Sequence, residues 1–199
     1  MSKNIKMYKG YKIEICQDED PMNPRDDDNL GTMVCFHGRY TLGDKHTLKT
    51  TDFNGWKDMY AYLKKELKAC IILPLYLYDH SGVSMSTSLT YPYNDQWDAG
   101  QVGFIYITAE KIRKEYNVKS ITKQSKEKVA EYLKGEVETY NKFLTGDIYG
   151  FVIKKLSTCD LGCEHEEVTD SCWGFYDTEY CIDEAKAMVD GYEKEAVPA

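Results

Sequence analysis

The chain has 199 residues, of which 33 are acidic and 25 are Lys or Arg, so its formal net charge is −8. That length favours a single domain of the usual size, about 100–200 residues, and a hydrophobic share of 42% excludes wholesale disorder. The longest apolar run, residues 71–78, is far shorter than the roughly 20 residues that a membrane-spanning helix needs. We therefore expect a globular protein that does not enter a membrane.

Hydrophobic periodicity predicts a series of strands and helices. In chain order these are strands at 11–15 and 31–37, a helix at 55–70, strands at 71–78, 83–87 and 102–107, helices at 108–116 and 125–144, strands at 148–153 and 172–176, and a helix at 183–192. Hairpins mixed with helices predict an α+β fold. We expect a single domain over residues 1–199, with a mixed, mostly antiparallel sheet, about four helices packed on it, and loose termini at 1–10 and 194–199.

Local signals mark the ends of several elements. Asp52 or Asn54 is suited to cap the first helix, and Asp183 is suited to cap the last. The turn at 79–82 predicts a hairpin between the strands on either side of it. Gly146 is placed to end the longest helix in the left-handed conformation.

The compartment is predicted from the first residues and the cysteines. MSKN leads into no apolar segment, so we expect no secretory signal. Seven cysteines, an odd number spread through strands and loops, do not form the pattern of a disulfide framework. We therefore expect reduced thiols and a cytoplasmic location.

The charge lies in three blocks. Residues 14–30 hold seven acids and one base, residues 158–195 hold twelve acids and two bases, and residues 110–128 hold seven bases and three acids. The two acidic blocks repel phosphate, so we expect no direct binding to nucleic acid. An acidic surface can attract a basic partner and speed its encounter, or the acids can serve solubility alone.

Five segments resemble a family of small proteins carried by tailed phages and other bacterial mobile elements. They are residues 28–40 (DNLGTMVCFHGRY), 42–46 (LGDKH), 73–82 (LPLYLYDHSG), 97–106 (WDAGQVGFIY) and 144–151 (LTGDIYGF). The resemblance extends over about residues 11–176 and implies a setting rather than a reaction: an accessory gene acting inside an infected bacterium. By analogy, it implies an inhibitor of host defence, of the anti-CRISPR or antirestriction kind.

A polar cluster near the predicted strand ends offers an enzymatic alternative. Its members are Asp26, Asp27, Asp28, His37, Arg39, Asp44, His46, Asp79, His80 and Asp98. Such side chains could hold a divalent metal or act as acid and base, as in a small metal-dependent hydrolase or nuclease. No spacing matches a metal motif, and Asp and Asn commonly form hydrogen-bonded turns, so we predict no metal and no cofactor.

The cysteines leave two more alternatives open. Cys159, Cys163, His165 and Cys172, with Cys181 beyond them, could supply a tetrahedral zinc site. The usual Cys-x2-Cys spacing is missing, which favours unligated reduced thiols.

A catalytic pair of Cys35 with His37 or His80 is the other alternative. Cys35 lies in an apolar predicted strand, where thiols are usually inert packing residues.

Aromatic residues in the irregular stretch 89–101 suggest a contact surface, although they could also fold back onto the core. The sequence thus favours a non-enzymatic protein that binds and inhibits a host protein or ribonucleoprotein complex with a basic surface. The residues expected to contact this partner are Asp26, Asp27, Asp28, Arg39, Asp44, Tyr91, Tyr93 and Trp97.

Overall fold

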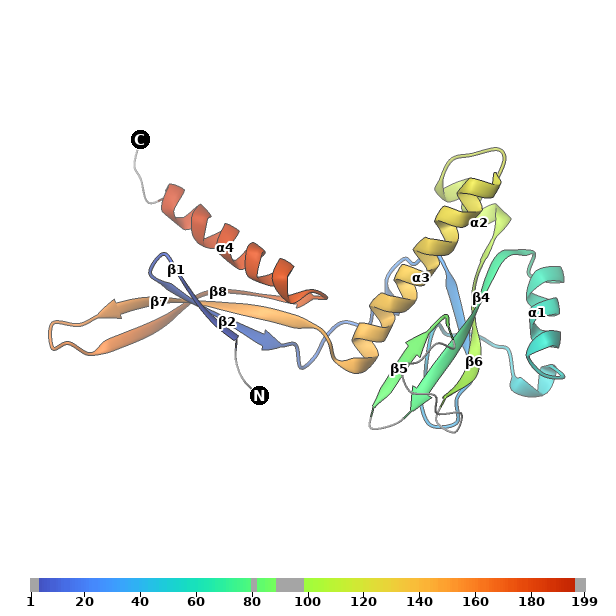
Figure 1. The fold of residues 1–199 in the computed structure, drawn as a ribbon, viewed down its shortest axis with the longest axis horizontal. Coiled ribbons are helices and arrows are strands. Elements are labelled where there is room, and N and C mark those ends of the chain that lie inside the picture. Colours follow the sequence, from blue (N-terminus) through green and yellow to red (C-terminus); the bar gives the residue numbers. More distant parts are fainter. Residues whose placement is uncertain (1–3, 80–81, 89–98, 196–199) are drawn as a thin grey trace. The chain divides into compact units, whose positions relative to one another are not determined.

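The computed structural model describes residues 4–79, 82–88 and 99–195. They form two compact units: a terminal unit from residues 4–22 and 146–195, and a central unit within residues 23–145. Each unit holds one four-stranded antiparallel sheet with helices packed on it (Figure 1). The expected α+β class, the antiparallel pairing and the four α-helices are confirmed. The single domain stays a prediction, and each unit is described by itself.

The terminal unit pairs its strands in the order β1-β2-β7-β8. Its elements are β1 (Asn4–Tyr8), β2 (Tyr11–Gln17), β7 (Tyr149–Thr158), β8 (Glu164–Phe175) and helix α4 (Thr178–Glu195). Alternate residues of a strand point to the same face of the sheet, and one such face is apolar here. It packs on one side of α4 through a core of Ile13, Ile15, Phe151, Ile153, Cys181, Ala185 and Val189.

The central unit pairs its strands in the order β3-β6-β4-β5. Its elements are the short 3-10 helix η1 (Pro24–Asp26), β3 (Thr32–Cys35), η2 (Thr50–Asp52), α1 (Trp56–Lys65), β4 (Ala69–Asp79), β5 (Val83–Ser86), β6 (Ala99–Thr108), α2 (Ala109–Glu115) and α3 (Lys123–Thr145). The predicted hairpin of β4 and β5 and the predicted helix with Val129, Leu133 and Val137 buried are confirmed.

Both faces of the central sheet are covered, because its strands are apolar at consecutive positions. Met33 and Ile105 face α3, and their neighbours Val34 and Phe104 face α1. Figure 1 shows α3 and α1 on opposite sides of this sheet. The central unit is therefore a three-layer arrangement, with helix, sheet and helix stacked in turn.

Gly103 of β6 and Pro74 of β4 mark two features of strand pairing in the central sheet. Gly103 lies so near β3 that a Cβ atom there would be 1.9 Å from the carbonyl oxygen of Val34, so no larger residue fits. Pro74 stands opposite Phe104 within β4, and β5 pairs only with Tyr76–Asp79 of that strand.

Three sequence expectations for the terminal unit are wrong in detail. Residues 4–8 were expected in a loose terminus but form β1, which pairs with β2 across a turn at Gly10. The segment between the strands predicted at 148–153 and 172–176 is mostly strand, because β7 and β8 pair as far as Thr158 and Glu164. The last helix begins at Thr178, where the Asp177 carboxylate, rather than that of Asp183, accepts a hydrogen bond from the Tyr180 N–H.

In the central unit, helix α1 is shorter than the periodicity predicts. It ends at Lys65, and Lys68 takes a positive φ of 53° before β4 begins at Ala69. Leu67 still packs on the core below α1, so the apolar spacing continues past the end of the helix. Thr108 caps α2 by accepting a hydrogen bond from the Lys111 N–H.

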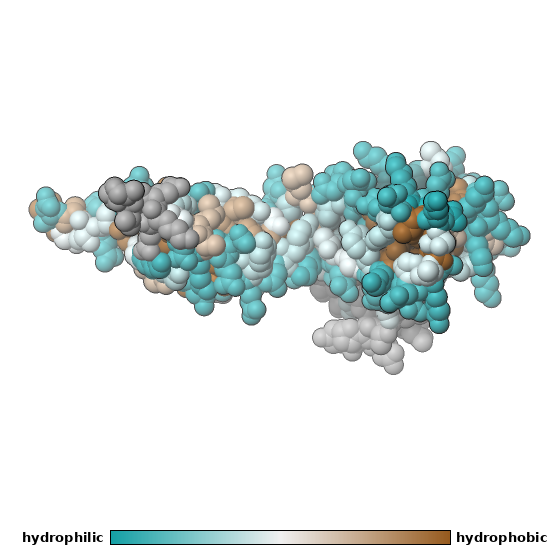
Figure 2. Space-filling view, turned by 90° about the horizontal axis from the view of Figure 1, so that it is seen from above, coloured by the Kyte–Doolittle hydropathy of each residue, from teal (hydrophilic) through white to brown (hydrophobic). Residues whose placement is uncertain are grey.

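Among the described residues, no helix combines the length and apolar character that crossing a membrane requires. Figure 2 shows one face of the molecule, on which hydrophilic residues predominate over most of the surface.

Candidate functional site

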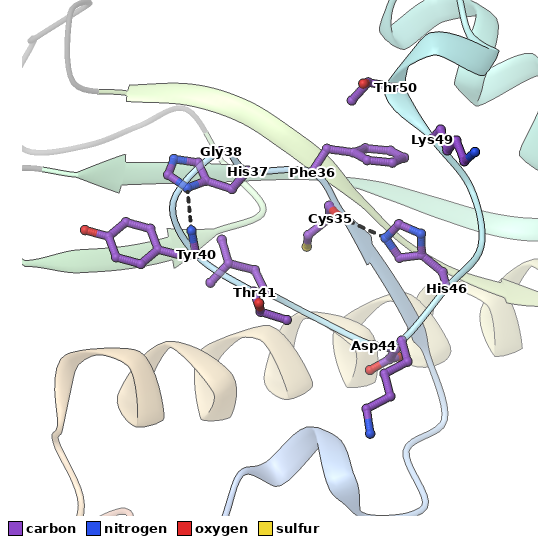
Figure 3. A pocket seen from close by; sticks show the side chains of 12 residues that line it. Cys35, Phe36, His37, Gly38, Tyr40, Thr41, Asp44, His46, Lys49 and Thr50 are labelled. Carbon is purple, nitrogen blue, oxygen red and sulfur yellow. Dashed lines mark hydrogen bonds between the residues drawn. The ribbon is translucent and has the colours of Figure 1, made fainter.

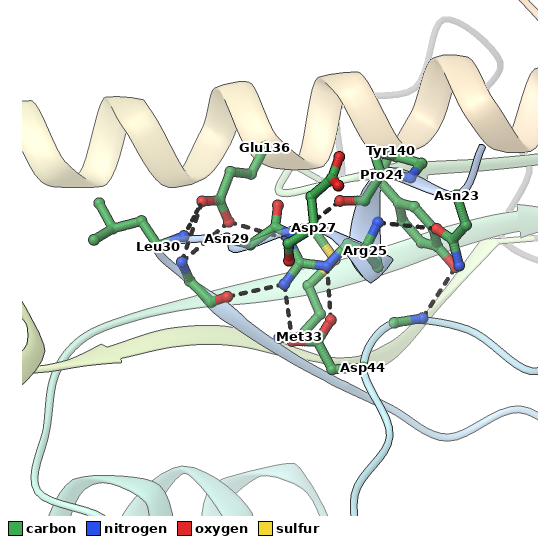
Figure 4. Close-up of polar contacts among 12 residues, drawn as sticks. Asn23, Pro24, Arg25, Asp27, Asn29, Leu30, Met33, Asp44, Glu136 and Tyr140 are labelled. Carbon is green, nitrogen blue, oxygen red and sulfur yellow. Dashed lines mark hydrogen bonds and ion pairs between the residues drawn. The ribbon is translucent and has the colours of Figure 1, made fainter. Parts of the chain in front are cut away.

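The acidic block of residues 14–30 contains one buried cation, Arg25. Its guanidinium is 2% exposed and binds both oxygens of Asp44, with Nε to Oδ1 at 2.7 Å and an Nη to Oδ2 at 2.8 Å. The other Nη donates to Glu136 of α3 at 3.1 Å, and the Gly31 carbonyl accepts a further hydrogen bond (Figure 4). A buried charge needs such partners, so the arginine holds three chain segments together.

The two carboxylates also bind the backbone. Glu136 accepts from the N–H groups of Leu30 at 2.6 Å and of Gly31, and Asp44 accepts from that of Met33 at 2.9 Å. These bonds connect the segment after η1 to α3 and to the start of β3. The backbone next to the acidic residues is thereby fixed from one side.

Asn29 and Lys111 fix the same segment from the other side. The Asn29 amide donates to the carbonyls of Pro24 and Asp27, both at 2.8 Å. The Lys111 ammonium of α2 donates to the Asn29 carbonyl at 2.6 Å. The turn is therefore held on both sides.

The electrostatics of the buried group favour its charged form. Burial alone would lower the pKa of the Arg25 guanidinium, but the hydrogen bonds and charges of Asp44 and Glu136 outweigh it and raise that pKa. The Arg25 guanidinium therefore stays charged although it is buried, and the role of the network is structural.

On this scaffold, Asp26, Asp27 and Asp28 are all exposed, and we call them the acidic loop. Within the described part of the chain, no cation pairs with their carboxylates. Asp44, expected to contact a partner as well, is instead engaged with Arg25 and Met33. The structure brings it close to the acidic loop but gives it an internal partner.

Arg39 lies in a separate exposed cluster. Its guanidinium pairs with Asp79 and lies over the ring of Tyr40, 5.6 Å from the ring centre. The His37 ring stacks on Tyr40, and its Nδ1 accepts from the Arg39 and Tyr40 N–H groups at 3.3 and 3.2 Å. This cluster forms a turn, and its arginine side chain is 71% exposed.

An open pocket of about 740 Å³ lies beside this turn, between residues 35 and 50. Figure 3 shows His46 at its wall, with Nε2 directed at the Cys35 carbonyl, 3.0 Å away. The His46 ring meets Phe36 edge-on, and its Nδ1 is buried with no hydrogen-bond partner in the described structure. Nε2 therefore carries the proton in the neutral ring, and His46 packs the loop against β3.

The proposed pair of Cys35 with His37 is not an activated nucleophile. Burial, with a smaller contribution from Asp44, raises the pKa of the Cys35 thiol to about 12. The thiolate is the reactive form of cysteine, so this thiol is inert at neutral pH.

Several residues suggested as metal ligands make structural contacts instead. Asp44, Asp79, His37 and His46 each have the structural partners given above. Within residues 4–79, 82–88 and 99–195, no three His, Cys, Asp or Glu side chains are arranged to hold a metal ion.

Five predicted site residues lie outside the described residues. They are His80, Tyr91, Tyr93, Trp97 and Asp98.

The late cysteines divide into one pair and two separate thiols. Cys159 and Cys163 flank the turn between β7 and β8, where the Cys159 N–H donates to the Cys163 carbonyl at 2.9 Å. Cys172 lies farther along β8, opposite Phe151, and Cys181 is a buried residue of α4 itself. The four cysteines do not converge on one point.

Sequence reasoning missed Arg25 and Glu136. The available signal was that Arg25 is the one base among seven acids in residues 14–30. Glu136 gave no signal, because it lies among many charged residues on a long helix.

Comparisons with protein-family models, with curated proteins and with solved structures found no match to this chain. The resemblance to proteins of phages and mobile elements therefore stays a prediction from the quoted segments.

Proposed function

We propose that this chain is a non-enzymatic binding protein that docks its acidic loop on a basic surface of another protein or ribonucleoprotein. The observation that carries the proposal is the loop itself: three exposed carboxylates, with no cation paired to them among the described residues, on a backbone fixed by the buried Arg25 network. The proposed setting is a phage-infected bacterium, supported by the sequence resemblance. There the partner is a host nucleic-acid-processing or defence complex, which the protein inhibits.

Preorganisation supports binding over solubility as the role of these acids. Binding normally costs free energy to order loops at the interface, and a loop fixed in advance avoids much of that cost. Charges that serve solubility alone need no fixed backbone. The Arg25 network, the Asn29 amide and Lys111 fix this one.

Electrostatics define the kind of partner. Three adjacent negative charges steer a basic surface during diffusional encounter and speed association most at low salt. The buried Arg25 does not cancel them, because Asp44 and Glu136 already neutralise it.

The test compares three versions of the full chain as bait in a bacterial lysate. One is wild type, one carries Asp26→Asn, Asp27→Asn and Asp28→Asn, and the control removes three charges elsewhere. The control carries Glu127→Gln, Glu131→Gln and Glu138→Gln, all exposed on α3. We expect wild type and control to retain a protein that the acidic-loop variant loses.

The retained protein then allows the mechanism to be measured. At low salt, the acidic-loop variant is expected to associate about tenfold more slowly, with a smaller difference at high salt, where charges are screened. Identical captured proteins for all three baits, or equal association rates at low salt, would contradict the proposal.

A further inference from the structure

The tip of the β7–β8 hairpin places two thiols and an imidazole on one face. The Gly162 N–H donates to the Cys159 carbonyl at 2.8 Å, and Gly162 has a φ of 80°. This is a three-residue turn with a glycine bulge, which leaves Cys159 and Cys163 opposite each other. His165 follows Cys163 by two residues and therefore points to the same face.

The spacing of this hairpin suits a disulfide between the two cysteines, which are free in the structure. Residues that face each other across an antiparallel pair have Cα atoms about 5.5 Å apart. Disulfides join cysteines whose Cα atoms lie about 4.4–6.8 Å apart. The general spacing of such a pair thus lies within the range that a disulfide spans.

The neighbouring side chains act on the Cys159 thiol: those of His165 and Cys163 both lower its pKa. Cys163 and His165 are exposed and Cys159 is half-buried, so small molecules in solution can reach the cluster.

This environment activates Cys159. The hydrogen bond from His165, followed by those from the backbone at Cys163 and Leu161, lowers the pKa of the Cys159 thiol from 9.0 to about 7. At pH 7 about half of it is thiolate, against about 1% for an unperturbed thiol. A thiolate of lower pKa is intrinsically less nucleophilic, here by roughly tenfold, which leaves a net gain in rate of about fivefold.

We propose that Cys159 and Cys163 form a redox-active dithiol that undergoes thiol–disulfide exchange with low-molecular-weight disulfides, His165 stabilising the attacking thiolate. This inference is independent of the proposed binding function, since it concerns only the hairpin.

The exchange takes two steps. The Cys159 thiolate attacks one sulfur of the small disulfide, whose S–S bond breaks and releases one thiolate. Cys163 then attacks the Cys159 sulfur, breaks the mixed disulfide and releases the second thiol, which takes the Cys163 proton. The two protein thiols lose two electrons and become a disulfide, and the small disulfide gains them and becomes one thiolate and one thiol.

The test treats the reduced full chain with oxidised glutathione at pH 7, stops the reaction with acid, and maps the products by peptide mass spectrometry. Wild type is expected to form the Cys159–Cys163 disulfide. Cys163→Ser is expected to stop at one mixed disulfide on Cys159. His165→Gln is expected to slow the first step by up to about fivefold, since the backbone bonds at Cys163 and Leu161 remain, and the control Cys172→Ser, on the same strand, to leave it unchanged.

Several outcomes would overturn the proposal. They are an equal rate of adduct formation on Cys172 and Cys159, an unchanged rate in His165→Gln, and a stable mixed disulfide in wild type with no internal bond. One equivalent of copurified zinc, with thiols that react only after chelation, would replace the dithiol by a metal site. Thermal melting of each variant checks that the hairpin substitutions leave the fold intact.

Discussion

Two small groups of polar side chains differ in their exposure. One is the Arg25 network of the central unit, made of Arg25, Asp44 and Glu136. The other is the Cys159 cluster of the terminal unit, made of Cys159, Cys163 and His165. Arg25 is 2% exposed, and its acceptors are Asp44, Glu136 and a backbone carbonyl. The Cys159 cluster lies at a hairpin tip open to solvent. Burial makes the first group a structural anchor, while exposure leaves the second group accessible to reagents.

Cys35 and Cys159 show the same contrast between a buried and a solvent-accessible setting. Burial raises the pKa of Cys35 to about 12, and the His165 hydrogen bond lowers that of Cys159 to about 7. The chemistry of each thiol is therefore set by its surroundings rather than by its place in the sequence.

The largest expected effect is the difference between the rates at which iodoacetamide alkylates Cys159 and Cys35. At pH 7 the ionised fraction of Cys159 exceeds that of Cys35 by about 10⁴- to 10⁵-fold. The rate at Cys159 is expected to rise with pH to half its plateau near pH 7, because the thiol is protonated below that pH. The titratable side chains that act on it are those of His165 and Cys163 on the same hairpin.

Mass spectrometry of the alkylated peptides measures both rates in one sample. Cys35 is expected to react only after denaturant unfolds the central unit. Alkylation of Cys35 in the folded protein, at a rate near that of Cys159, would show that the contrast in burial is wrong.

Arg25→Ala is expected to have a smaller effect, which is a loss of unfolding free energy. Removing one partner of a buried ion pair leaves uncompensated charge, here on Asp44 and Glu136, and typically costs about 3–5 kcal/mol of unfolding free energy. Urea unfolding measures it. The matched control is Arg39→Ala, which breaks an exposed pair with Asp79 and is expected to cost less than about 1 kcal/mol. Equal losses in the two variants would contradict the structural role of Arg25.

The smallest effect is expected from His165→Gln on stability. The residue is exposed, and surface substitutions usually change stability by less than about 0.5 kcal/mol. Its melting temperature should match that of wild type while Cys159 reacts more slowly. A clear fall in melting temperature would mean that His165 supports the hairpin fold.

Elements defined by side-chain burial were predictable from the sequence. Val129, Leu133 and Val137 recur at helical spacing because they face the central sheet, and α3 follows from that pattern. β1 was missed because its residues are exposed, and it is held by backbone pairing to β2. A strand that is held mainly by backbone hydrogen bonds needs no periodic pattern of hydrophobic residues, so periodicity cannot reveal it.

The candidate site residues also differ in how far the sequence could predict them. The exposure of Asp26, Asp27 and Asp28 follows from their charge, whereas the engagement of Asp44 by Arg25 depends on two segments meeting in space. Cys159, Cys163 and His165 were singled out in the sequence only as possible zinc ligands. Its pairing with His165 required the register of β7 and β8, which periodicity does not supply.

Pro74 has a consequence for how the chain avoids self-association. Because β5 pairs with β4 only from Tyr76 onward, the first half of β4 has no partner strand on that side among the described strands, although it is rich in Ile and Leu. Such an edge is a template for a strand from another copy. Proline has no N–H to offer an incoming strand, so Pro74, near the end of that stretch, makes the edge a poorer template than its Ile and Leu residues alone would.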